Sequence, residues 1–227
     1  LKNLIGGQWL YKSKKSFKKL KPYMEEIHKT GAKLFVQLTA GFGRSFSVPN
    51  ALVPILKSKV LNAVLKPIID VRYLCASPSK LPSRWADGVF TRALTKKEIE
   101  KMIDAFAKTA KMCKDAGVDG VEVHAVHEGY LLDQFTTEYT NQRTDEYGGS
   151  FENRYRFPVE VVKAIKAACG QDYPVSLRYS VVSKTKGFQK GALPGEEYTE
   201  VGRDMEESEK AAKYLQDAGY DMLNADN

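Results

Sequence analysis

The sequence has few cysteines, few histidines and no long apolar segment. Its three cysteines, Cys75, Cys113 and Cys169, lie far apart and form no CxxC pair. This spacing excludes a disulfide framework, a zinc ribbon and an iron–sulfur loop within these 227 residues, and it is typical of a reducing cytoplasm. The longest apolar runs, such as residues 51–56, are far too short to cross a membrane. We therefore expect a cytoplasmic protein with no membrane partner.

The net charge of +7 comes partly from lysines concentrated in residues 12–21. Apolar residues recur at helical spacing in this segment and in the residues that follow it. The lysines therefore fall on the solvated side of one helix. No alternation of aromatic and basic residues accompanies them, and we expect no nucleic-acid partner. A positive field of this kind steers anionic substrates or cofactors.

An amphipathic helix, a glycine and a strand follow one another four times along the chain. The spacing predicts helices at about residues 16–29, 95–116, 150–169 and 204–218, and strands at 33–39, 118–124, 174–180 and 220–226. Thr95 with Glu98 and Asp204 with Glu207 have the spacing of a capping box. Such helix-then-strand units with short links require parallel strands joined by right-handed crossovers.

One polar residue lies near the carboxyl end of each predicted strand, opposite in parity to the apolar ones. These residues are Gln37, His124, Arg178 and Asn224. The pattern suits the lumen of a barrel, where catalytic groups come from several strand ends, whereas a doubly wound sheet favours a glycine-rich first turn, which is absent. We predict an α/β fold, a (β/α)₈ TIM barrel that is incomplete, with about four central strand–helix units.

A long insertion at about residues 45–94 separates the first two predicted strands. It is rich in proline, serine and lysine, and Pro78, Pro82 and Trp85 suggest an ordered cover with an aromatic anchor. A segment of this length is typically a lid or a substrate-binding loop, although a surface loop packed on the barrel rim fits equally well. Residues 1–227 otherwise read as one barrel domain.

The densest group of reactive side chains follows the second predicted strand. His124 and His127, with Glu122 and Glu128 nearby, have spacings that suit zinc or iron. A metal-dependent barrel hydrolase that uses the two histidines is therefore one alternative function.

Several motifs resemble the flavin-dependent ene reductases of the Old Yellow Enzyme family. They are VQL with AG at 36–41, GVEVHAVH at 120–127, GYL at 129–131, TNQRTDEYGGS with ENR at 140–154, and SLR at 176–178. The chain is most similar to the branch of 2-enoate reductase, 2,4-dienoyl-CoA reductase and the bile-acid-inducible NADH:flavin oxidoreductases. The resemblance covers nearly the whole chain, with residues 45–94 the least similar part.

The resemblance implies FMN across the barrel mouth, with Gln37 at the pyrimidine edge of the flavin and Arg178 beside its N1 and O2. It implies hydride transfer from flavin N5 to the β-carbon of an enone or enoyl thioester, with NAD(P)H as the electron source. Tyr130 is then the acid that protonates the α-carbon. His124 and His127 are the implied donors to the substrate carbonyl.

One departure concerns Glu128, which turns the common HxxHGYL pattern into HxxHEGYL. The dienoyl-CoA reductase branch also has Glu-Gly-Tyr, and the change leaves open which of His124 and His127 contacts the carbonyl. We expect Arg143 and Asp145 to form an internal pair that fixes the loop, and Glu122 and Asn153 to be structural.

The sequence shows four helix–strand units, whereas a complete barrel of about 250 residues contains eight. We therefore expect the chain to be a fragment of the barrel that binds FMN weakly. An inactive fragment is the second alternative. Larger members of the branch carry a 4Fe-4S cluster and FAD beyond the barrel, for which this segment has no ligands. The specific substrate, the direction of reaction, the choice between NADH and NADPH and the oligomeric state are left open.

Overall fold

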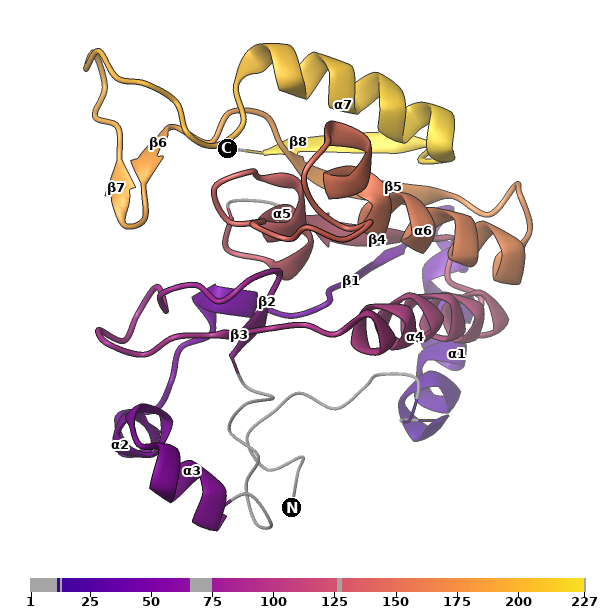
Figure 1. Ribbon diagram of the computed structural model, residues 1–227. Coiled ribbons are helices and arrows are strands. Elements are labelled where there is room, and N and C mark those ends of the chain that lie inside the picture. Colours follow the sequence, from indigo (N-terminus) through magenta and orange to yellow (C-terminus); the bar gives the residue numbers. More distant parts are fainter. Residues whose placement is uncertain (1–11, 13, 66–74, 126–127, 227) are drawn as a thin grey trace.

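Four strands form a single parallel sheet in the computed structural model, which describes residues 12, 14–65, 75–125 and 128–226 (Figure 1). In spatial order they are β1 (Phe35–Leu38), β4 (Gly120–Ala125), β5 (Val175–Ser180) and β8 (Met222–Asp226). All three pairings are parallel, with Val36 opposite Val121 and Leu177 opposite Leu223. The predicted parallel strands are confirmed.

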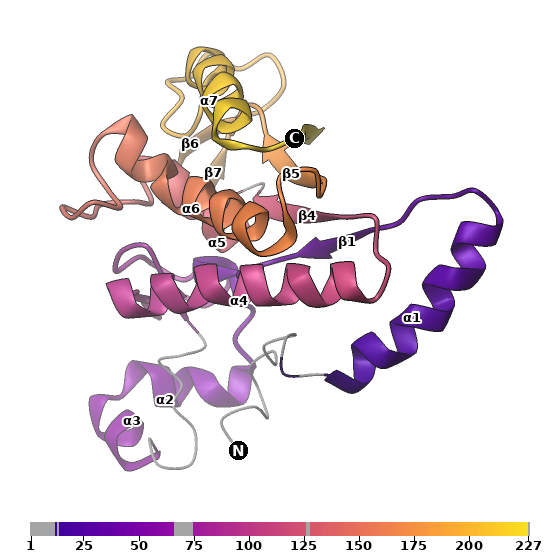
Figure 2. The ribbon, with the colours of Figure 1, turned by 90° about the vertical axis from the view of Figure 1, so that its right-hand side faces the viewer.

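A long helix precedes each strand. These helices are α1 (Lys14–Lys29), α4 (Lys96–Asp115), α6 (Phe151–Cys169) and α7 (Met205–Ala218). Helices α4, α6 and α7 lie along the outer side of the sheet (Figure 2). The main core forms between helices and sheet, and Val121, Val123 and Val175 are fully buried there. No helix of the described part of the chain is long and apolar enough to cross a membrane.

The helix starts follow the predicted caps, with one exception. The Thr95 side chain accepts from the Glu98 backbone N–H while the Glu98 carboxylate accepts from the Thr95 backbone, so α4 has a full capping box. Asp204 likewise caps α7, accepting from the Glu207 N–H at 2.8 Å. The Glu207 carboxylate, however, accepts from Arg154 instead of the Asp204 backbone. The second capping box is therefore only half formed, because a buried arginine is the stronger partner.

We expect Thr95→Ala to lower the free energy of unfolding by about 1 kcal/mol, the usual loss when a helix loses its N-cap acceptor. Thr95→Ser keeps the hydroxyl and is the matched control. Urea unfolding followed by circular dichroism measures both, and equal midpoints for the two variants would show that the cap contributes nothing.

The insertion is ordered where it is described, and it packs around a small core of its own. The short helix η2 (Gly43–Ser45) leads into it. Its helices are η3 (Asn50–Leu52), α2 (Val53–Lys57) and α3 (Lys59–Leu65). Two short strands, β2 (Ala76–Ser77) and β3 (Arg92–Ala93), pair in parallel. Its buried residues include Val48, Leu52 and Val89. Trp85, the expected aromatic anchor of the cover, is 63% exposed. Its indole N–H donates to the Ser45 carbonyl at 2.9 Å, and the Arg84 guanidinium lies 5.2 Å from its ring centroid.

A hairpin that the sequence pattern did not reveal follows β5. Its strands β6 (Thr185–Gly187) and β7 (Lys190–Gly191) pair antiparallel. The Gln189 side chain between them donates to the Arg84 carbonyl at 3.0 Å. This contact joins the hairpin to the insertion, although the two segments are far apart in the sequence.

The short helix α5 (Leu131–Thr136) begins where the loop after β4 ends. Its first backbone N–H, from Leu131, donates to the Gly41 carbonyl at 2.9 Å. Gly41 has a φ of +99°, which side-chain-bearing residues rarely adopt. A glycine is therefore required where the segment after β1 meets the start of α5.

Candidate functional site

Glu122 lies at the centre of the polar face of the sheet and connects all four strands. Its carboxylate accepts from Gln37 Nε2 at 2.7 Å, Asn224 Nδ2 at 3.0 Å and Ser176 Oγ at 3.1 Å. Partial burial alone would raise the pKa of Glu122, but these hydrogen bonds and the charge of Arg178 outweigh it and lower the pKa. The arrangement agrees with the structural role that the sequence suggested for Glu122.

We expect Glu122→Gln to destabilise the fold by about 1 kcal/mol near neutral pH, because the new amide N–H₂ faces donors that have lost an acceptor. The folded pKa of Glu122 lies below its ordinary value of 4.5. Its contribution is therefore present above that value and is lost as the pH falls below it.

The difference between wild type and Glu122→Gln should accordingly shrink on acidification. Urea midpoints at neutral and acidic pH test this, with exposed Glu209→Gln as the control. A difference that stays constant with pH would contradict the role of the carboxylate.

The two residues predicted to contact a cofactor lie on this same polar face. Gln37 is exposed beside Glu122, and the Arg178 side chain is 36% exposed. Arg178 donates from Nε to the Asp226 carboxylate at 2.8 Å, and a second bond from Nη2 holds its plane. A carboxamide and an oriented guanidinium match the carbonyl and N–H groups at the pyrimidine edge of a flavin. The residues present therefore fit the flavin that the sequence implied.

Tyr130 and His124 meet at the carboxyl end of β4. Tyr130 precedes α5, and its ring contacts those of His124 and Phe42, with centroids 3.6 and 5.1 Å away. His124 is buried at 5% exposure, whereas Tyr130 is partly exposed. The structure brings together two of the three predicted catalytic residues, and His127 lies outside the described residues. The sequence analysis did not single out Phe42.

A buried polar network around Glu128 was also missed by sequence reasoning. Arg44 is 1% exposed and donates from Nη1 to the Glu128 carboxylate, whose second oxygen accepts from the Tyr139 hydroxyl. Arg44 Nε donates to the Pro82 carbonyl at 3.0 Å. Burial raises the pKa of Glu128, although the charge of Arg44 opposes this. The departure from the common motif at Glu128 was the one feature of the sequence that drew attention to this network.

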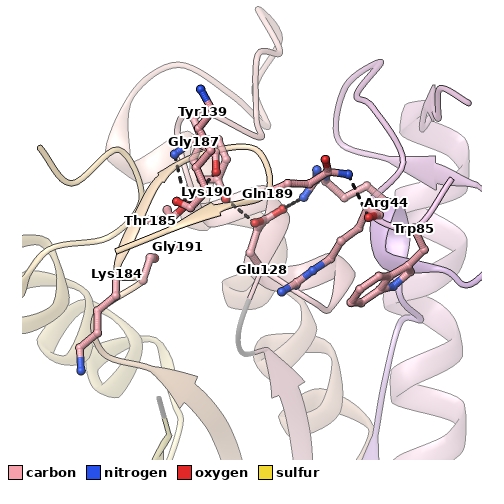
Figure 3. A pocket seen from close by; sticks show the side chains of 12 residues that line it. Arg44, Trp85, Glu128, Tyr139, Lys184, Thr185, Gly187, Gln189, Lys190 and Gly191 are labelled. Atoms are coloured by element: carbon pink, nitrogen blue, oxygen red, sulfur yellow. Dashed lines mark hydrogen bonds and ion pairs between the residues drawn. The ribbon is translucent and has the colours of Figure 1, made fainter. Parts of the chain in front are cut away.

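A cavity of about 350 Å³ opens next to this network (Figure 3). Its walls come from the insertion, from the loop after β4 and from the β6–β7 hairpin. Charged and aromatic residues on its walls include Arg44, Arg84, Trp85, Glu128, Lys184 and Lys190.

The loop of residues 140–154 is held by the pair that the sequence predicted. Arg143 donates to the Asp145 carboxylate at 2.9 Å from Nε and at 2.6 Å from Nη2. Arg143 Nη1 also donates to the carbonyls of Pro78 and Leu94. The pair is confirmed, and it additionally joins this loop to the insertion.

The alternative of a metal site finds no support in the described residues, which contain no group of three His, Cys, Asp or Glu side chains that could hold an ion. Glu122 and Glu128 belong to two separate hydrogen-bond networks.

Comparison with known proteins gives the same family as the motifs. The family model described as NADH:flavin oxidoreductase / NADH oxidase matches residues 7–220. Cinnamate reductase of Clostridium sporogenes is 52% identical over 202 residues, which is 89% of this chain and 27% of that protein. NADH oxidase of Thermoanaerobacter brockii is 36% identical over 88% of this chain and 25% of its own length.

A solved old yellow enzyme homologue from Zymomonas mobilis supports the barrel fold. It is 27% identical, with a TM-score of 0.61, over 91% of this chain and 51% of that structure. The chain thus spans about a quarter of the two curated relatives and about half of the solved one. The predicted partial TIM barrel is confirmed, and so is the predicted likeness to Old Yellow Enzyme. With the match over residues 7–220 and the motifs on one polar face, the chain belongs to the NADH:flavin oxidoreductase / NADH oxidase family.

Proposed function

We propose that the chain is the flavin-binding part of an ene reductase that reduces the double bond of an enoate, an enoyl thioester or an enone. The observation that carries this is the stacking of Tyr130 on His124 at the end of β4, on the polar face that holds Gln37 and Arg178. The 52% identity to a cinnamate reductase supports an unsaturated aryl acid as a substrate.

Gln37 and Arg178 hold the cofactor, FMN, in this proposal. When bound, FMN supplies the hydride for the β-carbon, with NAD(P)H as its electron source. Gln37 orients the pyrimidine edge by hydrogen bonding, and the positive charge of Arg178 stabilises negative charge there. The Asp226 carboxylate keeps the guanidinium of Arg178 in one orientation.

Tyr130 delivers the proton to the α-carbon. Its ring packs against the rings of Phe42 and His124, which fixes the direction of the hydroxyl. Buried His124 acts mainly by supporting that ring, which leaves His127 as the donor to the substrate carbonyl. General acid catalysis needs such a fixed donor within reach of the carbon that gains the proton.

We propose that any 4Fe-4S cluster and FAD of the complete enzyme are bound outside these residues. Cys75, Cys113 and Cys169 are all buried. Burial raises the pKa of the Cys75 thiol to about 11 and that of Cys113 to about 12. A cluster needs thiolates, so these side chains are unsuited to ligate one.

The described part of the insertion at residues 45–94 forms one side of the substrate site in this proposal. Arg84 and Trp85 supply part of the wall of the cavity next to Glu128. Arg143 and Gln189 hold the insertion against the rest of the chain. These contacts support the lid interpretation over a surface loop in this proposal.

The test is a two-step anaerobic reaction of the complete, flavin-loaded enzyme. NADH should bleach the flavin, and cinnamate should then restore its colour while the saturated acid forms. In D₂O the product should carry one solvent deuterium at the α-carbon. A reduced protein that no unsaturated acid, thioester or ketone reoxidises would contradict the proposed function.

A further inference from the structure

The cavity beside Arg44 carries an excess of positive charge that the proposed reaction has not used. Arg44, Arg84, Lys184 and Lys190 line it, and Glu128 is the one carboxylate on its wall among the described residues. That carboxylate is already bonded to Arg44 and to Tyr139. Four cations therefore face one carboxylate on this wall, so the net charge of the lining is positive.

Arg44 is the innermost of these cations. Its side chain is 1% exposed, one face of its guanidinium lies 4.6 Å from the centroid of the Phe188 ring, and Nη1 and Nε are bonded. Nη2 is buried and has no hydrogen-bond partner among the described residues. An unsatisfied, buried and charged N–H₂ group is costly, and an incoming oxyanion would satisfy it.

The size and composition of the cavity indicate an organic ligand and not a small inorganic ion. Its volume of about 350 Å³ falls in the range of small-molecule pockets. The Trp85 ring is 63% exposed on its wall, with the Arg84 guanidinium 5.2 Å from the ring centroid. An aromatic surface next to cations suits a molecule that has both an apolar body and a negative group.

We propose that this cavity binds an oxyanion of the substrate, either the carboxylate of an unsaturated acid or a phosphate on the carrier of a thioester. The inference rests on the proposed reductase function and names a substrate class for it. Glu128 on the cavity wall is two residues from Tyr130 in the sequence, so one loop carries both a wall residue and the proposed proton donor. Lys184 and Lys190 attract the anion from solvent, and Arg44 Nη2 contacts it at the inner end.

The test removes the two hairpin cations in Lys184→Gln/Lys190→Gln. Lys186→Gln is the matched control, because Lys186 is on the same hairpin, pairs with Glu196 at 2.7 Å and does not line the cavity. The measured quantity is kcat/KM for an anionic substrate divided by kcat/KM for methyl cinnamate, which is uncharged. Cinnamate and cinnamoyl-CoA are the two anionic substrates.

We expect the ratio to fall about tenfold in the double variant and to be unchanged in the control. A fall with cinnamate assigns the cavity to a carboxylate, and a fall with cinnamoyl-CoA alone assigns it to a phosphate. Unchanged ratios for both, including an equal loss with methyl cinnamate, would overturn the proposal.

Equilibrium dialysis of cinnamate and cinnamoyl-CoA with the oxidised, flavin-loaded protein separates this inference from the reductase function. Weaker binding of either ligand to the double variant supports the cavity even if no substrate is turned over, in which case the reductase function fails alone. If both ligands have equal dissociation constants with the wild type and the double variant, the proposal that the cavity binds the oxyanion is refuted, whatever the reductase activity.

Discussion

Tyr130→Phe is expected to slow reoxidation of the reduced flavin by an unsaturated substrate about 10²–10⁴-fold, while NADH reduces the flavin at the wild-type rate. The physical reason is that hydride arrival at the β-carbon leaves negative charge at the α-carbon, which only a positioned proton donor relieves. Phenylalanine keeps the ring contacts with His124 and Phe42 and removes the hydroxyl alone.

Stopped-flow absorbance measures the two half-reactions of this variant separately. Tyr214→Phe is the matched control, since Tyr214 lies on α7 and its ring packs against Phe151 at 5.4 Å. Reoxidation of Tyr130→Phe at the wild-type rate would remove Tyr130 from the role of acid. Slowing of both half-reactions would indicate disturbed flavin binding instead.

Arg203→Ala is expected to lower the free energy of unfolding by about 3–5 kcal/mol, the usual loss when one partner of a buried ion pair is removed. Arg203 and Asp133 are each 2% exposed and lie 2.8 Å apart. Burial alone would lower the pKa of Arg203, but the charge of Asp133 holds it above its ordinary value. Arg203 also donates to the Tyr155 hydroxyl at 2.8 Å and to the Ser180 carbonyl.

Urea unfolding measures this loss against Lys213→Ala, which breaks an exposed pair with Asp217 one helical turn away. The control should change stability by less than about 0.5 kcal/mol. A loss below about 1 kcal/mol for Arg203→Ala would mean that water or another cation replaces the guanidinium.

The strands and helix ends could be predicted because their signals are local. A glycine after each helix, alternation along each strand and the Thr95 cap all act within a few residues, and the structure has them as expected. Glu207 shows the limit of such signals. Its spacing from Asp204 fits a capping box, yet Arg154, which is distant in the sequence, takes its carboxylate.

The contact at the end of β4 could be expected from the sequence, whereas the contacts between distant loops could not. Tyr130 and His124 share one short segment, so their contact follows from the end of β4. Arg44 and Glu128 are 84 residues apart, and no pattern in the sequence pairs them. The hairpin at residues 185–191 has strands of three and two residues, too short for alternation to be detected.

The position of the insertion has a consequence for the entropy of the unfolded chain. It occupies the connection between β1 and α4, while β1 itself pairs with β4 through a register that sets Gln37 opposite Glu122. The entropic cost of closing a loop grows only with the logarithm of its length, so that doubling the loop adds about 0.6 kcal/mol. The length of this segment therefore has little influence on the stability of the sheet. Mutation and recombination can therefore change the length of the insertion while the register between Gln37 and Glu122 is kept.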